Sequence, residues 1–307
     1  MKKIITIIIL CIGIFTIYNI RPMYTYIDMN LINKEEFAKT LNPLETEYLF
    51  NINQNFVQIS DKSKMSNKQD LLNLIYTTLN YGIEETSLYC GEEYENCYLD
   101  LIEMANDGTE FSIINDLVHP YHKFKQMKIN RNNVGKITIK FERLYSPSQV
   151  NYIEQTTDKI IKELNLDNDK YKEFTERERI KIIHDYLINN SKYSTENEDD
   201  KSAYGVFYNK TGNCRGYTEA FLILAHKLDI ETVPISNGDH VWNLVKINNK
   251  WYHLDVTWDD PVASDGKDYL IYDYYLLTSS ELNKVNRNNE HTYDLDFYNE
   301  NNFLKIE

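Results

Sequence analysis

Residues 212–217 read Gly-Asn-Cys-Arg-Gly-Tyr, and the segments on either side can be placed from this stretch. Residues 211–213 are typical of a turn that opens a helix. Apolar residues then recur at helical spacing: Tyr217, Phe221, Leu224, Ala225 and Leu228. Cys214 therefore falls in the first turn of a predicted helix. The N–H groups and partial positive charge of a helix start stabilise a thiolate and can serve as oxyanion donors. Arg215 is expected to point to solvent.

A histidine and an aspartate follow Cys214 along the chain. His240 opens the aromatic-rich, alternating segment 240–247, and Asp255 lies in a second such segment, 250–257. Two asparagines separate the segments, and Asn suits the positive φ angles of a two-residue hairpin turn. With Ile247 opposite Lys250, His240 and Asp255 share one face of the hairpin as diagonal neighbours. A three-residue turn would place them on opposite faces, so a joint role for both side chains requires the two-residue turn.

Composition excludes several classes of protein. The chain has 307 residues, 42% hydrophobic and 26% charged, which is typical of a globular protein with one large domain or two modest ones. The formal net charge is −14, and the sequence lacks a basic stripe with interleaved aromatics. Nucleic acid is therefore not an expected partner.

The N-terminus resembles an export signal. Lys2 and Lys3 precede an apolar run from Ile4 to Ile20, and no small-x-small cleavage site follows it. We expect residues 1–22 to form a signal anchor in the cell membrane, with a cleaved signal peptide as the alternative. Residues 23–307 would then lie outside the cell, and residues 23–63 suit a stalk or linker.

Cys90 and Cys97 are separated by six residues in the predicted extracellular part. In an oxidising compartment they could form a disulfide, and two unpaired thiols are the alternative. A zinc site with His119 and His122 is a third, less favoured interpretation, because the cysteine spacing is wide for zinc ligands. We expect no metal and no cofactor.

Residues 64–145 are predicted to form a small α+β domain. The stretch 66–80 has a helical apolar stripe that Ser66 could cap, and residues 87–90 and 97–103 could be short strands. Residues 136–144 alternate between apolar and polar side chains, which predicts a half-buried strand.

Residues 146–307 are predicted to form the second domain. Ser146 with Gln149, and Thr175 with Glu178, match the capping box that starts a helix. The second of these helices carries His184 on its apolar face, where a packed, hydrogen-bonded histidine is expected rather than a ligand. Residues 231–236 are predicted to form a strand.

Several separate sequence blocks, spanning roughly residues 175–278, resemble the transglutaminase-like superfamily, especially its bacterial extracellular members. The blocks are Ile183-His184-Asp185-Tyr186, Ala203-Tyr204-Gly205, residues 212–217, residues 240–243 and residues 251–261. Asn213 and Val241 depart from residues common in the family, but neither is a reacting group. The resemblance implies a papain-like α+β core, in which the helix bearing Cys214 packs on an antiparallel sheet.

The resemblance also implies a mechanism. Cys214 would attack an amide carbonyl and form a thioester, His240 would transfer the proton, and Asp255 would orient the imidazole. Trp242, Trp258 and Tyr204 are candidate residues of the substrate cleft, and core packing is the alternative for both tryptophans. The substrates would be proteins, peptides or cell-wall peptides, with an amine or water resolving the thioester. A catalytically silent scaffold at the cell envelope is the alternative function.

Overall fold

A computed structural model describes residues 64–167, 171, 173–262, 269–285 and 289–293. Among these residues, no helix is both long and apolar enough to cross a membrane. The predicted membrane segment at 1–22 and the predicted stalk at 23–63 lie outside the described residues.

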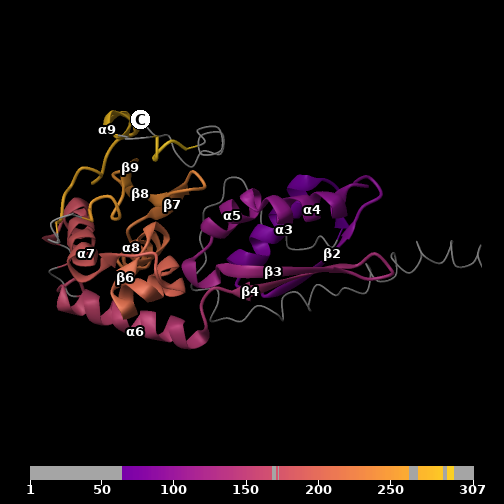
Figure 1. Cartoon of the computed structure of the whole chain (residues 1–307), viewed down its shortest axis with the longest axis horizontal. Coiled ribbons are helices and arrows are strands. Elements are labelled where there is room, and N and C mark those ends of the chain that lie inside the picture. The colour runs from indigo at the N-terminus through magenta and orange to yellow at the C-terminus, as the bar shows by residue number, and fades with distance from the viewer. Residues whose placement is uncertain (1–63, 168–170, 172, 263–268, 286–288, 294–307) are drawn as a thin grey trace, which may run out of the picture. The chain divides into compact units, whose positions relative to one another are not determined.

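The chain divides into two compact units (Figure 1). The described residues of the first unit are 64–111 and 124–144, and those of the second are 112–123 and the described part of the chain from 145 onward. The sequence-based division placed all of 64–145 in the first domain. Residues 112–123 belong instead to the second unit, where Lys123 forms a buried ion pair with Glu219.

The first unit combines helices with a four-stranded sheet. Its strands lie in the order β1-β2-β4-β3, with β1 parallel to β2 and the other pairs antiparallel. The predicted strand at 136–144 is confirmed as β4, in which Ile137, Ile139 and Phe141 are buried. The elements are β1 (Lys64–Met65), α3 (Lys68–Asn80), β2 (Glu85–Cys90), α4 (Cys97–Asp107), β3 (Phe124–Arg131) and β4 (Ile137–Arg143), and α5 (Thr109–Asp116) leads from this unit into the second.

Two predictions for the first unit need correction. Residues 97–103 are helical rather than extended, because Cys97, Leu101 and Met104 are spaced to bury one face of α4. The cap of α3 is Asn67 rather than Ser66, since the Asn67 side chain accepts the hydrogen bond of the Asp70 N–H.

Cys90 and Cys97 form a disulfide, with their Cα atoms 5.6 Å apart. It joins the last residue of β2 to the first residue of α4. Of the three states considered for this pair, the disulfide is the one present, so the zinc interpretation is wrong. His119 and His122 lie in the second unit, where His119 Nδ1 accepts a hydrogen bond from the Tyr121 N–H.

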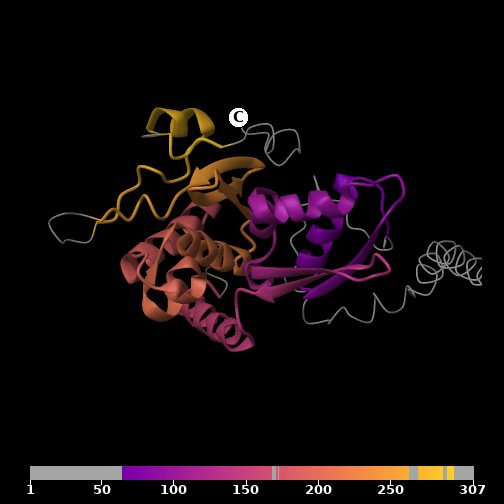
Figure 2. The same cartoon turned by 45° about the vertical axis from the view of Figure 1, so that its right-hand side comes forward.

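The second unit is built around α8 (Cys214–Lys227), in which all residues from Gly216 to Ala225 are buried. This helix contacts β7, β8, α6 and α7 (Figure 2). The three-stranded sheet is antiparallel, in the order β7-β8-β9. The unit contains α6 (Pro147–Glu163), α7 (Glu176–Asn190), β5 (Lys192–Tyr193), β6 (Thr211–Gly212), β7 (Thr232–Ser236), β8 (Val241–Ile247), β9 (Lys250–Leu254) and α9 (Ser279–Val285), with 3-10 turns at Pro120–His122 and Glu198–Lys201 and a π-helical turn at Gly205–Asn209.

Both predicted capping boxes are present. The Ser146 and Thr175 hydroxyls accept the N–H groups of Gln149 and Glu178, and those two side chains accept the N–H groups of the caps in return. Helices α6 and α7 therefore start where the sequence predicted.

The predicted two-residue turn is confirmed. Ile247 pairs with Lys250, and Asn248 and Asn249 have φ angles of 50° and 64°. A type I′ turn needs positive φ at both central residues, and Asn tolerates it better than most residues. The helices and the largely antiparallel sheets confirm the predicted α+β class, with the Cys-bearing helix next to the antiparallel sheet β7-β8-β9.

Candidate active site

Cys214 is the first residue of α8, as predicted. The Asn213 side chain caps the helix by accepting the N–H groups of Arg215 and Gly216, and the Asn213 N–H donates to the Asp200 carbonyl at 2.8 Å. A Cβ atom added at Gly216 would lie 2.6 Å from that same carbonyl oxygen. Glycine is therefore needed after the cysteine so that the helix start can approach the Asp200 turn.

Arg215 does not point freely to solvent, as the sequence analysis expected. Its guanidinium donates to Asp116 Oδ1 at 2.6 Å, and Lys123 Nζ lies 3.1 Å from the same oxygen. Asp116 is the last residue of α5 and Lys123 lies immediately before β3, and nothing in the local sequence around Cys214 indicates this pairing. Arg215 therefore attaches the start of α8 to residues 112–123.

His240 lies immediately before β8. Its backbone N–H donates to Asn237 Oδ1 at 2.8 Å, and its ring stacks on Trp242 with centroids 5.6 Å apart and planes inclined by 15°. Ring atom Nε2 lies 2.5 Å from Asp255 Oδ2. The turn at residues 248–249 thus brings His240 and Asp255 together as the sequence predicted.

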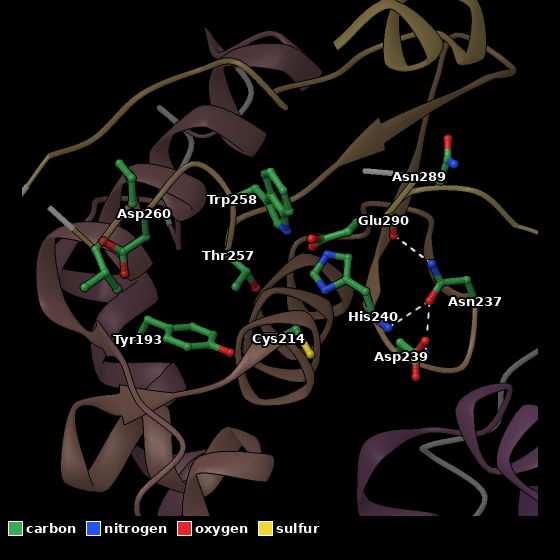
Figure 3. A pocket seen from close by; sticks show the side chains of 12 residues that line it. Tyr193, Cys214, Asn237, Asp239, His240, Thr257, Trp258, Asp260, Asn289 and Glu290 are labelled. Atoms are coloured by element: carbon green, nitrogen blue, oxygen red, sulfur yellow. Dashed lines mark hydrogen bonds between the residues drawn. The ribbon is translucent and has the colours of Figure 1, made fainter. Parts of the chain in front are cut away.

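His240 also interacts with Cys214. Burial lowers the pKa of His240, but the Asp255 carboxylate and the hydrogen bonds with Asp255 and Cys214 outweigh burial and raise it to about 10. Nε2 is used by Asp255, so Nδ1 is the nitrogen that remains for the sulfur. Figure 3 shows one ring nitrogen of His240 directed toward the Cys214 side chain. His240 therefore connects the sulfur of Cys214 with the carboxylate of Asp255.

Asp255 follows β9 and is 2% exposed. Its Oδ1 accepts the N–H groups of Thr257 and Trp258 at 2.9 and 3.2 Å. Burial acts to raise the pKa of Asp255, but the charge of His240 and the hydrogen bonds from His240 and His291 hold it well below its usual range. The carboxylate is therefore ionised and fixed by hydrogen bonds from both backbone and side chains.

His291 is a site residue that the sequence analysis missed. It is buried, and its Nε2 lies 2.7 Å from the same oxygen of Asp255 that His240 contacts. Tyr274 stacks on its ring at 4.7 Å and 21°, and Trp258 meets it edge-on at 5.1 Å. The polar stretch around His291 carries no motif or periodicity, so only tertiary packing identifies it.

A cavity of about 580 Å³ opens over Cys214 and His240 (Figure 3). Its remaining lining residues are Tyr193, Asn237, Asp239, Thr257, Trp258, Asp260, Pro261, Val262, Asn289 and Glu290. Three of the lining side chains are acidic and none is a lysine or arginine. The thiol is thus open to a substrate, and the cavity around it carries negative charge.

The three predicted cleft residues lie in different places. Trp258 lines the cavity. Trp242 is 1% exposed beneath the His240 ring and donates its indole N–H to His253 Nδ1, so it packs in the core. Tyr204 lies outside the cavity lining and stacks on Tyr208 with ring centroids 5.0 Å apart.

The site also holds a potential metal-ligating group. Ligand atoms of His240, Asp255 and His291 all lie within 4.8 Å of one another. The short contacts from both imidazoles to Asp255 Oδ2 account for this arrangement as a hydrogen-bonded cluster. A metal ion would replace these hydrogen bonds and use the His240 nitrogen that now holds Asp255.

A second carboxylate–histidine group lies in the same unit. His184 is completely buried, with Nδ1 2.9 Å from Asp185 Oδ1 and Nε2 3.1 Å from Asp259 Oδ2. Asp259 also accepts the Tyr274 N–H, and its own N–H donates to the Asp255 carbonyl. The packed, hydrogen-bonded histidine predicted for this helix face is confirmed, and it holds the turn that follows Asp255.

Residues 165–256 match the family model of the transglutaminase-like superfamily, and the matched segment contains Cys214, His240 and Asp255. These residues form a transglutaminase-like domain. The resemblance predicted from the sequence is thereby confirmed.

Two solved structures are similar to parts of the chain. One is a TGase, with 13% identity and a TM-score of 0.31, and the similarity covers 44% of this chain and 45% of that one. The other is a candidate cysteine protease from Cytophaga hutchinsonii, with 14% identity and a TM-score of 0.27, covering 47% of this chain and 65% of that one. The chain thus spans less than two thirds of either protein. No curated protein matches it.

Proposed function

We propose that the transglutaminase-like domain catalyses thiol-dependent acyl transfer on protein or peptide amides through a thioester at Cys214. The observation that carries this proposal is the contact of Cys214 at a helix start with His240, which Asp255 holds from the other side. Nucleophile, proton carrier and orienting carboxylate are the three parts that such a mechanism requires.

In the first step, the Cys214 sulfur attacks the carbonyl carbon of the amide and the π electron pair moves to the oxygen. The tetrahedral intermediate then collapses, the C–N bond breaks, and the leaving nitrogen takes the proton of the His240 imidazolium. The products are a thioester and a free amine or ammonia. Asp255 keeps the His240 imidazole oriented while the charge of the imidazole changes.

In the second step, water or an amine attacks the thioester carbonyl and gives its proton to neutral His240. The C–S bond breaks, which restores the thiolate and the imidazolium. Water yields a carboxylic acid and an amine yields a new amide. The same three residues serve both outcomes, so the class of acceptor is a matter for experiment.

We place this activity outside the cytoplasm, on protein, peptide or cell-wall peptide substrates. Two observations support this location: the charged, apolar N-terminus expected to anchor the chain, and the Cys90–Cys97 disulfide. Structural disulfides persist mainly in oxidising compartments.

Labelling of Cys214 tests the proposal directly. Iodoacetamide should alkylate Cys214 faster at pH 6 in the folded protein than in the urea-unfolded chain, because the thiolate is the reacting species. The variant His240→Asn should lose this advantage. Equal rates in the folded and unfolded states would contradict a catalytic thiol.

Product analysis then separates the outcomes. A transferase attaches a dansyl-labelled primary amine to a glutamine-bearing protein, whereas a hydrolase releases acid or peptide fragments. Both activities must vanish in Cys214→Ala. A Cys214→Ala protein that sustains the full cellular role would instead support the scaffold alternative.

A further inference from the structure

Four charged side chains form a largely buried network beside the start of α8. Two of them, Arg215 and Glu219, lie one turn apart on the helix, and the other two, Asp116 and Lys123, come from the segment 112–123. Arg215 donates to Asp116 Oδ1 at 2.6 Å. Lys123 Nζ lies 3.1 Å from the same oxygen and 3.0 Å from Glu219 Oε1. Two cations thus face two carboxylates, and their charges balance.

Asp116 is the member that binds both cations. Burial acts to raise the pKa of Asp116, but the charges of Lys123 and Arg215 and the hydrogen bonds from both outweigh burial and hold the pKa below its ordinary value. The carboxylate is therefore ionised at neutral pH. Its hydrogen bond from the Arg215 guanidinium is charge-assisted, which is the strong kind, so it restrains the Arg215 side chain.

Glu219 connects the network to a second segment of the chain. Glu219 Oε2 accepts the hydroxyl of Tyr145, whose pKa is raised well above its ordinary value by burial and by Glu219. The Tyr145 oxygen accepts the Ala203 N–H at 2.8 Å. The loop that leads to Ala203 also binds the chain just before the nucleophile, since the Asn213 N–H donates to one of its carbonyls. Contacts on both sides of the nucleophile therefore hold the start of α8.

The network lies outside the cavity and partly outside the matched domain. None of its four charged residues lines the cavity described over Cys214. Asp116 and Lys123 also precede the segment 165–256 that matches the transglutaminase-like family. Any effect of the network on the reaction must pass through the main chain of α8, where Arg215 is the residue next to the nucleophile.

We propose that Arg215 and Asp116 are positioning residues, whose ion pair fixes the first turn of α8 and so keeps the Cys214 sulfur aligned with His240 and the amide carbonyl. This proposal rests on the proposed function. A nucleophile displaced by about 1 Å from its productive position can lose about 10²-fold in rate. The ion pair thus contributes to the rate without touching the substrate.

The charge of Arg215 is the competing explanation. The Asp116 carboxylate is the main cause of the raised pKa of Arg215, but the charge of Cys214 also contributes, so the guanidinium and the sulfur interact. If the charge of Arg215 acted by itself, removal of the opposing carboxylate in Asp116→Asn would raise the rate. Positioning predicts a fall. Asp116→Asn keeps the shape of the side chain and therefore separates the two explanations.

The test measures acylation of the full chain by p-nitrophenyl acetate, in which the S–C bond forms and nitrophenolate leaves. Arg215→Met removes the guanidinium but leaves Lys123 between two carboxylates, so no buried charge loses its last partner. The acylation rate constant per titrated thiol should fall by about 10²-fold, with KM within about twofold of the wild type. Arg215→Lys, which restores a cation without the planar fork, should recover about tenfold.

A double-mutant cycle shows whether the two residues act as a pair. Asp116→Asn should lower the rate constant about as much as Arg215→Met, and the double variant should lose no more than either single variant. Losses that multiply in the double variant would contradict the proposal.

The matched control is an ion pair at the other end of the same helix. Lys227, the last residue of α8, lies 2.7 Å from both Glu154 and Asp158. Lys227→Met removes this pair, and it should leave the acylation rate constant within about twofold of the wild type. Urea unfolding of each variant establishes that it is folded in the assay.

Three results would overturn the assignment. These are an Arg215→Met rate close to that of the wild type, an equal loss in Lys227→Met, or a faster reaction in Asp116→Asn. If the wild type releases no nitrophenolate that depends on Cys214, the proposed function fails as well. If the wild type is active and Arg215→Met equals it, the proposed function survives without these positioning residues.

Discussion

Two histidines of the second unit lie between similar partners but in different surroundings. His240 contacts Asp255, and His184 contacts Asp259, only four residues further along the same turn. His240 borders an open cavity and faces a cysteine, whereas His184 is completely sealed in the core between two carboxylates. The pairing of imidazole with carboxylate is therefore common to both, and access to a nucleophile distinguishes them.

Their positions on the chain explain the difference. His184 lies in the middle of α7, on the face that packs in the core, so its ring serves only to fix the turn after Asp255. His240 lies immediately before the central strand β8, at the end of that strand, where a side chain can be fixed on one side and open to the cavity on the other. A charged buried pair and a candidate catalytic pair are thus neighbours on one turn, with separate roles.

The largest difference between the two histidines is expected in activity. His240→Asn should lower kcat/KM per folded molecule on the order of 10⁶-fold, the size seen when the base of a catalytic triad is removed. The free energy of unfolding should fall as well, because the buried Asp255 carboxylate loses its cationic partner. Steady-state kinetics with p-nitrophenyl acetate and urea unfolding measure the two effects. If His240→Asn kept a hundredth of the wild-type activity, His240 would not be the base, and the distinction between the two histidines would be lost.

Asp255→Asn should lower kcat/KM by about 10⁴-fold and change its pH dependence. The raised pKa of His240 means that its protonated form persists as the pH increases, so the wild-type rate should fall only as the pH approaches about 10. Without the negative charge at residue 255 the pKa of His240 decreases, and the fall should begin at lower pH. An unchanged alkaline limb would show that Asp255 does not set the charge of His240.

His184→Leu should lose stability without the loss of rate expected for His240→Asn. It leaves Asp259 buried without its cationic partner, which should lower the free energy of unfolding by about 3 kcal/mol. The rate per folded molecule should stay within about threefold of the wild type. Urea unfolding followed by fluorescence, and active-site titration with iodoacetamide, would check both. A loss of rate without a loss of stability would mean that His184 takes part in the chemistry.

The smallest effect is expected at His291, which acts through Asp255. His291→Phe keeps an aromatic ring in contact with Tyr274 and Trp258 but removes the hydrogen bond to the Asp255 carboxylate. Because such a hydrogen bond is worth about 1.5 kcal/mol, kcat/KM should fall about tenfold. His291→Gln supplies an N–H donor and should recover part of this loss. Equal losses in both variants would indicate packing alone.

Local signals in the sequence predicted most of the second unit. The capping boxes at Ser146 and Thr175 placed two helices, and the asparagine pair at 248–249 fixed the hairpin register. In the first unit, one strand was predicted where α4 forms, because a short apolar run with aromatic residues does not by itself separate helix from strand.

The sequence by itself determined the order of Cys214, His240 and Asp255, the helix start under the cysteine and the turn that joins the other two. These features depend on residues close in the chain, whose geometry is set by backbone dihedral angles and local hydrogen bonds. Only the tertiary structure decided that His291 contacts Asp255, that Asp116 binds Arg215 and that Tyr193 faces the sulfur. Those contacts join segments separated by up to 99 residues. They exist because the packing of the core brings these segments together, and no local pattern encodes that packing.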